Sequence, residues 1–119
     1  MKRTRIARVS KKHAKELREY AALYHKLKEL CRRDDGEYYS ELDGRKKSFW
    51  SCGELCPGLD CHHIDGKQNA RLIDPFNIIC IGQGGEHSAE TAHHSFERIQ
   101  ELKALVRPIR LAQGFVEIP

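Results

Sequence analysis

The sequence predicts an α+β protein in which a long basic helix is followed by a strand–loop–strand–helix unit. Three observations lead to this class. They are an apolar stripe at helical spacing early in the chain, two short apolar segments bounded by turn residues near the middle, and a second helical pattern near the end. The length of 119 residues fits a single domain, 1–119. We expect 1–35 to hold the basic arm and helix, and 52–107 to hold the strands and the later helix.

The first helix is predicted to run from Ser10, as its N-cap, to about Arg33. Apolar side chains recur there at steps of three and four and form one stripe: Leu17, Tyr20, Ala21, Tyr24, Leu27 and Cys31. Because Cys31 lies on this stripe, we expect it in the core. Gly36 should end the helix, since glycine readily adopts the left-handed conformation found at helix ends.

Turn formers and β-branched residues divide the rest of the chain. Residues 36–51 are mixed and rich in turn formers, which predicts a loop or a weak hairpin. Short strands are predicted at 59–64 and at 76–81, each bounded by turn residues. After a flexible glycine-rich connector, a helical pattern covers about 88–107 and should stop at Pro108.

Positive charge is concentrated at the start of the chain. Residues 1–33 carry twelve Lys/Arg and three Asp/Glu, whereas the remaining residues carry nine and fourteen. Clustered Lys and Arg release counterions from phosphate backbones, so this arm indicates a polyanionic partner; the alternative is a solvated helix face. No apolar run approaches the roughly 18 residues that span a bilayer, and there is no signal peptide. We therefore expect a soluble cytoplasmic protein with no membrane partner, while its oligomeric state stays open.

Histidines gather in the second half of the chain. Five of the seven lie close together: His62, His63, His87, His93 and His94. Neighbouring residues on a strand point to opposite sides, so one of His62 and His63 can face a metal while the other faces a substrate. Imidazole is a good ligand for zinc, nickel or manganese, and it also suits general-base chemistry. The alternative is that these histidines only hold the fold.

The order of these residues resembles a known nuclease motif. His62-His63, then Asn77, then His87 with a histidine at 93 or 94, is similar to the HNH motif of the ββα-metal, or His-Me finger, nucleases. The segment CHHIDGKQNARLIDPFNIIC is similar to small phage-type HNH proteins. The resemblance implies a ββα-metal finger preceded by a long basic N-terminal helix, and an endonuclease that cuts DNA. A phage-encoded protein of this kind would act in the cytoplasm of the bacterial host.

The resemblance also implies roles for individual residues. His63 would be the general base, and Asn77 would hold the loop that carries it. One divalent ion of magnesium, manganese, nickel or zinc would be bound by three histidines: His62, His87 and His93. Hydrolysis would leave a 5′-phosphate and a 3′-hydroxyl. Contacts to the DNA backbone would come from the basic arm: Arg3, Arg5, Arg8, Lys11 and Lys12.

Spacing leaves the last metal ligand open. If a helix begins directly after His87, then His87 and His94 lie about 10 Å apart along its axis, too far to share one ion. A role for His93 requires an irregular connector before it, and Glu90 is the alternative ligand. Asn77 also has a simpler interpretation, as a polar residue at a strand edge after a proline turn.

The five cysteines argue against a disulfide framework, because their number is odd and no secretion signal precedes them. Four of them lie among or just before the histidines, at spacings looser than paired Cys-x-x-Cys knuckles. We expect these four either to bind one structural zinc ion or to be buried thiols: Cys52, Cys56, Cys61 and Cys80.

Two alternatives to a nuclease stay open at this point. The incomplete cysteine pattern and the long histidine spacing motivate a zinc-stabilised DNA-binding module that does not cut. The other alternative is an accessory protein in phage DNA packaging, repair or recombination, in which the histidines hold the fold.

Overall fold

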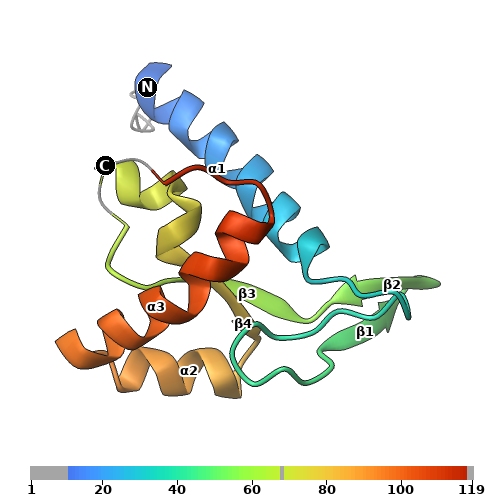
Figure 1. Ribbon diagram of the computed structural model, residues 1–119. Helices are drawn as coiled ribbons and strands as arrows, with labels where there is room; N and C mark the ends of the chain where they lie inside the picture. The colour runs from blue at the N-terminus through green and yellow to red at the C-terminus, as the bar shows by residue number, and fades with distance from the viewer. Residues whose placement is uncertain (1–10, 68, 118–119) are drawn as a thin grey trace, which may run out of the picture.

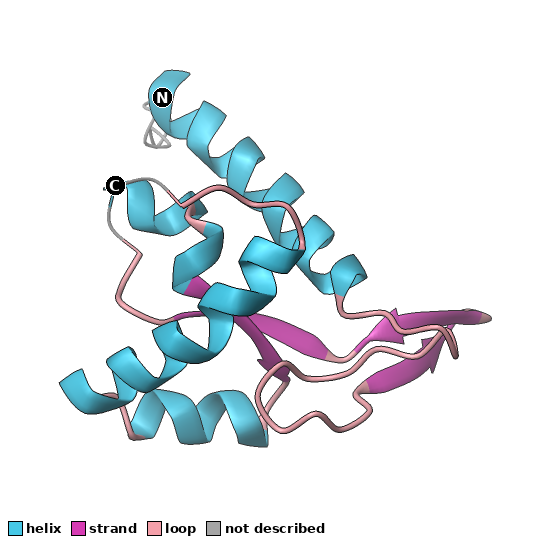
Figure 2. Ribbon diagram, viewed as in Figure 1, coloured by secondary structure: helices cyan, strands magenta, loops and turns pink. Residues whose placement is uncertain are grey.

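The described part of the chain forms three α-helices and two antiparallel sheets of two strands each (Figure 1). The computed structural model describes residues 11–67 and 69–117. Helices, strands and loops are mixed along the chain (Figure 2), which confirms the predicted α+β class. None of the described helices is long and apolar enough to cross a membrane.

A hairpin of β3 (Leu59–His63) and β4 (Ile78–Gly82) lies between helices. Helix α1 (Lys11–Leu30) packs on one face of this hairpin and α3 (Phe96–Ala112) on the other, as Figure 1 shows. Both faces of the two strands are therefore buried. This explains why β4 is a continuous apolar run and not an alternating one.

Two apolar clusters make up the core. The cluster toward α1 consists of Leu27, Cys31, Tyr38, Leu59, Cys61, Ile78 and Cys80. The cluster toward α3 consists of Ile64, Ile79, Ile81, Leu102 and Val106. Successive residues of β4 thus contribute to different clusters, as the pleat requires. The same alternation decides to which face each histidine of β3 belongs.

The C-terminal part of α1 packs into the core. Leu27 is fully buried, whereas Leu17 is 43% exposed although both belong to the predicted stripe. A helix of 20 residues is about 30 Å long, whereas a five-residue strand spans about 17 Å. The hairpin is therefore too short to cover the whole stripe. Cys31, just after the helix, is buried as predicted.

A second hairpin is formed by β1 (Ser48–Ser51) and β2 (Glu54–Pro57). The prediction of a loop or weak hairpin for 36–51 covers β1 but misses β2. The turn consists of Cys52 and Gly53, whose φ angles of 52° and 80° are those of a type I′ hairpin turn. An Asn or Asp before the glycine would have marked this turn in the sequence, and a cysteine does not.

The predicted helix at 88–107 is two helices, α2 (Gly85–Ala92) and α3. Ser95 begins α3 as its N-cap, because its side-chain oxygen accepts a hydrogen bond from the backbone N–H of Arg98 at 3.1 Å. Pro108 lies inside α3 and does not end it. Apolar periodicity alone could not reveal the break, since apolar residues continue at helical steps across it.

Two short 3-10 helices occupy the loop between the central strands. The first, η1, covers Asn69–Ile73, and the second, η2, covers Pro75–Asn77. Asp74 caps η2 by accepting a hydrogen bond from the backbone N–H of Phe76 at 3.0 Å. Because this turn occupies the start of the predicted strand at 76–81, β4 begins two residues later than predicted.

A buried ion pair connects distant parts of the chain. The guanidinium of Arg110 in α3 is fully buried and donates to both carboxylate oxygens of Glu41, each at 2.6 Å. It also donates to the backbone carbonyls of Pro75 at 3.0 Å and Ile78 at 2.8 Å. A buried charge requires such extensive pairing. The pair therefore fixes α3 to the segment between α1 and β1 and to the start of β4.

Candidate functional site

His62 and His63 are the last two residues of β3 and belong to different faces of the strand. The ring of His62 lies against the ring of His87 from α2, with centroids 5.2 Å apart. The ring of His63 lies 5.4 Å from the ring of Tyr20 in α1. The two histidines are thus separated as strand alternation predicts, but both reach the same pocket at the end of the strand.

This pocket has a volume of 370 Å³. It is lined by residues of β3, the following loop, α2 and the break after it: Cys61, His62, His63, Gly66, Lys67, His87, Thr91 and His94. Four of the five clustered histidines therefore border one space. We call it the histidine pocket.

His87 is oriented by a carboxylate of β3. Its Nδ1–H donates to Asp60 at 2.9 Å, since the carboxylate can only accept. The neutral ring then carries its free lone pair on Nε2. Asp60 lies two residues before His62 and therefore on the same face of the strand. A carboxylate that orients an imidazole in this way is typical of histidines that bind metals.

His62 is kept neutral by its surroundings. Burial, and after it the proximity of His87, lowers its pKa to about 4. Its Nε2 is buried and has no hydrogen-bond partner among the described residues. Because buried polar atoms nearly always have a partner, this nitrogen fits a ligand that the protein binds. A neutral imidazole is the form that coordinates a metal ion, so the free Nε2 of His62 is suited to be a metal ligand.

His63 has one nitrogen engaged and one free. Its Nε2–H donates to the backbone carbonyl of Leu72 at 3.1 Å, so the lone pair of the neutral ring is on Nδ1. In the described part of the chain this buried Nδ1 has no partner. Burial lowers the pKa of His63, which favours the neutral form. Such a ring can accept a proton from a group held in the pocket.

Asn77 holds the loop that follows β3. Its side-chain oxygen accepts from the backbone N–H of Asp65 at 2.8 Å, and its amide donates to the carbonyls of Gly66 at 2.9 Å and Arg71 at 3.0 Å. The side chain is only 3% exposed, so it is more than a polar residue at a strand edge. The loop held in this way includes the carbonyl that orients His63.

The fourth histidine of the pocket is His94, whereas the sequence prediction named His93 as the third metal ligand. His93 is the exposed C-cap of α2 and does not line the pocket. The Nε2–H of His94 donates to the backbone carbonyl of Ile64 at 3.1 Å, which leaves Nδ1 with the lone pair. A role for His93 required an irregular connector before that residue. In the structure α2 continues to Ala92, and the irregular connector begins only at His93.

Glu90, the alternative ligand, is engaged elsewhere. Its carboxylate forms a bidentate pair with Arg98, with distances of 2.9 Å and 2.5 Å. This pair lowers the pKa of Glu90 and keeps it charged. Glu90 is absent from the lining of the histidine pocket, so it is a neighbour of the site and not a ligand in this arrangement.

The four cysteines predicted to bind zinc are not brought together. Cys52 is in the exposed turn of the β1–β2 hairpin, and the thiol of Cys56 lies 3.7 Å from the carbonyl of Glu54 in the same hairpin. Cys61 and Cys80 face each other across β3 and β4, with sulfurs 3.9 Å apart. Among the described residues, no group of potential metal ligands includes Cys52 or Cys56.

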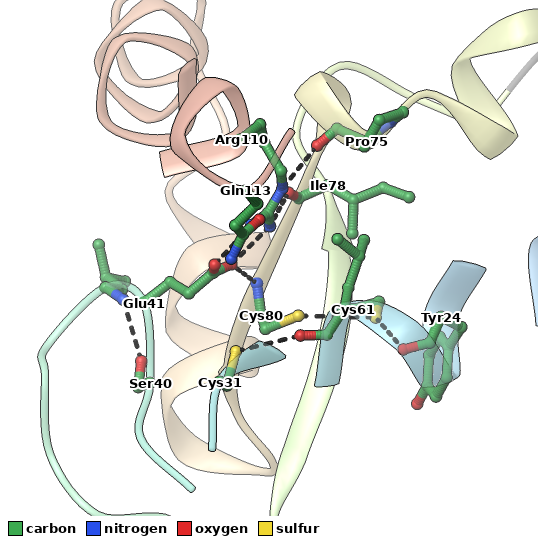
Figure 3. Close-up of polar contacts among 12 residues, drawn as sticks. Tyr24, Cys31, Ser40, Glu41, Cys61, Pro75, Ile78, Cys80, Arg110 and Gln113 are labelled. Atoms are coloured by element: carbon green, nitrogen blue, oxygen red, sulfur yellow. Dashed lines mark hydrogen bonds and ion pairs between the residues drawn. The ribbon is translucent and has the colours of Figure 1, made fainter. Parts of the chain in front are cut away.

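Cys80 instead lies beside Cys31 and Glu41. The potential ligand atoms of these three residues lie within 4.8 Å of one another, so the cluster could hold a metal ion. Figure 3 shows these side chains together with Cys61 and Arg110. Hydrogen bonds from the thiols of Cys31 and Cys61 lower the pKa of Cys80 well below that of an ordinary thiol.

Comparison with known protein families, curated proteins and solved structures finds no match to this chain. The histidine pocket is therefore the basis for a proposal about function.

The sequence analysis did not single out Asp60 or Leu72. A carboxylate two residues before a histidine on a strand shares its face, and this spacing could have identified Asp60. The contribution of Leu72 could not be found, because it comes from the backbone and leaves no side-chain signal.

Most of the predicted DNA-contacting residues cannot be placed. Arg3, Arg5 and Arg8 lie outside the described residues, and Lys11 and Lys12 are the first two residues of α1. Within the described part of α1, Tyr20 contacts His63, so this helix passes beside the histidine pocket.

Proposed function

We propose that the protein is a metal-dependent DNA endonuclease of the HNH type. The histidine pocket supports this proposal. Two buried imidazoles, His62 and His63, line it, and each has one ring nitrogen without a hydrogen-bond partner among the described residues. One nitrogen suits a metal and the other suits a proton transfer. These are the two functions that hydrolysis of a phosphodiester needs.

His63 is the general base of the proposed reaction. Its Nδ1 takes the proton of the attacking water. The carbonyl of Leu72 fixes the tautomer through Nε2–H and stabilises the imidazolium that forms. Asn77 keeps this loop in place through its three hydrogen bonds. Fixing the ring before the reaction lowers the cost of reaching the transition state.

Three histidines form the proposed metal side of the pocket: His62, His87 and His94. A divalent cation bound there would supply positive charge to the phosphate oxygens and to the departing 3′ oxygen. Because imidazoles carry no negative charge, they leave that positive charge available to the DNA backbone. Asp60 orients His87 for this role. The products would be a 5′-phosphate and a 3′-hydroxyl.

The DNA backbone is proposed to lie along α1. Lys15 and Arg18 are exposed on this helix, and the exposed Lys67 borders the histidine pocket. The basic residues that precede the helix in the sequence would add to this positive charge. Contacts of this kind position DNA without reading its sequence.

Plasmid cleavage tests the proposal directly. The protein with Mg²⁺, Mn²⁺, Ni²⁺ or Zn²⁺ should convert supercoiled plasmid to nicked or linear forms in at least one metal. His63→Ala should lower the rate by at least about 100-fold, because a positioned general base contributes about that much. His25→Ala, which changes an exposed histidine of α1, should keep the parent rate.

Two outcomes would contradict the proposal. If His63→Ala cuts as fast as the parent, His63 is not the base. If the parent binds DNA in a salt-sensitive manner but cuts it with none of the metals, the protein is the non-catalytic DNA-binding module.

The third ligand is tested by a matched pair of neighbouring histidines. His94→Ala should weaken Mn²⁺ binding by at least about tenfold, because loss of a direct ligand costs no less than loss of a residue that supports one. His93→Ala should bind Mn²⁺ like the parent, since His93 is exposed and does not border the pocket. Isothermal titration calorimetry measures both affinities. The reverse order would restore His93 as the ligand.

A further inference from the structure

Three thiols and a carboxylate converge in the core away from the metal side of the histidine pocket. Cys31 follows α1, Cys61 and Cys80 face each other on β3 and β4, and Glu41 precedes β1. All three cysteines are buried. Figure 3 shows their sulfurs and the Glu41 carboxylate gathered around Cys80. Four separate segments of the chain thus bring metal-ligand types to one place.

The spacing of these groups suits a tetrahedral metal. The sulfurs of Cys61 and Cys80 are 3.9 Å apart. In a tetrahedral zinc site with Zn–S bonds of about 2.3 Å, neighbouring sulfurs lie about 3.8 Å apart. The potential ligand atoms of Cys31, Glu41 and Cys80 lie within 4.8 Å of one another. Cys61 lies outside this group of three but next to Cys80, so its side chain would have to turn toward Cys31 and Glu41 for all four to share one ion.

Glu41 has room for one further bond. A carboxylate has about four lone-pair positions. Three are used, by both terminal nitrogens of Arg110 and by the backbone N–H of Cys80. The remaining position can face a cation. Carboxylate ligands of metals are commonly held by such hydrogen bonds.

The charge of the cluster also suits zinc. Three thiolates and one carboxylate around Zn²⁺ carry a formal charge of about −2 (four anionic ligands against one dication). Arg110 is fully buried beside them and reduces this excess to about −1, which lowers the cost of burying the site. A small core gains stability from such a link.

We propose that Cys31, Glu41, Cys61 and Cys80 form a structural zinc site that joins α1 to the β3–β4 hairpin. The site is separate from the proposed metal site of the histidine pocket and does not depend on nuclease activity. Cys52 and Cys56, which the sequence groups with Cys61 and Cys80, take no part in it. Cys61 borders the histidine pocket as well, so the two sites share one strand.

Cobalt substitution tests the site by its spectrum. Reduced full-length protein, freed of metal by a chelator, is titrated with Co²⁺. One equivalent should produce the near-ultraviolet band of cobalt–thiolate bonds and visible bands of tetrahedral cobalt, and Zn²⁺ should abolish both. A histidine site gives no thiolate band. The double variant His62→Ala and His87→Ala should therefore keep the thiolate band.

Cysteine variants locate the ligands. Cys31→Ser and Cys61→Ser should each weaken the thiolate band, whereas Cys52→Ser and Cys56→Ser should leave it unchanged. Glu41→Gln should weaken Zn²⁺ affinity at least about tenfold, because a neutral amide is a poorer ligand. The titration of the unaltered protein tests the proposal even if a core variant does not fold.

Three results would overturn the proposal. The first is a parent protein whose thiols give no cobalt band. The second is a band that disappears with Cys52→Ser or Cys56→Ser. The third is a parent protein, purified without reductant, that contains no zinc and weighs 2 Da less than its reduced mass, because the core cysteines would then form a disulfide (about 2 Da for two hydrogens lost on S–S formation).

Discussion

At the scale of single residues, the imidazoles of the histidine pocket differ in the group that accepts the hydrogen bond from their ring N–H. His87 donates to the carboxylate of Asp60, whereas His63 and His94 donate to backbone carbonyls. The anionic partner increases electron density on the ring that is proposed to bind a metal. A neutral carbonyl orients the proposed base without the added charge of a carboxylate. The partner therefore distinguishes His87 from His63, whereas His94 is proposed as a ligand because of its place in the pocket.

Removal of the Asp60 carboxylate should test this difference. Asp60→Ala should weaken Mn²⁺ binding by about 10- to 100-fold, because such partners orient the ligand and raise its basicity. Asp34→Ala, which removes an exposed carboxylate before Gly36, is the matched control and should bind like the parent. Calorimetric titration gives both affinities, and equal binding by Asp60→Ala would exclude this role.

At the scale of elements, the break between α2 and α3 shapes the pocket. A continuous helix would place His87 and His94 about 10 Å apart along its axis. The chain instead leaves the helix after Ala92 and restarts at Ser95, so that His94 turns back toward the loop after β3. The break thus brings His94 to the space that His87 and Thr91 of α2 also border.

The cap of α3 maintains this break. Ser95→Ala should lower the free energy of unfolding by about 1 kcal/mol, the usual cost of losing an N-cap side chain. Ser88→Ala, at an exposed position within α2, should leave stability unchanged or raise it slightly, because alanine favours helix interiors. Urea denaturation monitored by circular dichroism measures both. Equal effects of the two changes would show that the cap does not stabilise the break.

The sequence predicts those elements whose signal is local. Both central strands and α1 follow from patterns within about twenty residues, and the histidines of β3 and α2 are recognisable by their order. The type I′ turn at Cys52 lacks its usual residues, so β2 was missed. The thiol cluster depends on Glu41 and Arg110, whose contact joins residues far apart in the chain. No local pattern could reveal it.

At the scale of the whole molecule, one ion pair joins the early and late parts of the chain. Glu41 lies between α1 and β1, whereas Arg110 lies in the last turns of α3. Both are withdrawn from solvent, with side chains 7% and 0% exposed. Breaking such a pair leaves a buried charge without a partner, which is much costlier than losing a surface pair.

Two arginine–glutamate pairs of α3 allow a direct comparison. Arg110→Met should lower the free energy of unfolding by about 3–5 kcal/mol, because Glu41 would stay buried without its partner. Arg107→Met removes an exposed pair with Glu117 and should cost at most about 1 kcal/mol. Urea denaturation measures both. Similar losses would mean that burial does not decide the strength of these pairs.

Arg110 also has a consequence for how mutations in this gene would be interpreted. It donates to the carbonyls of Pro75 and Ile78, on either side of Asn77 in the chain. A premature stop codon just after Ser95 would preserve every histidine of the pocket and yet remove this support. In a screen for lost function, damaging changes should therefore extend well past the last histidine, into a helix that contributes no residue to the histidine pocket.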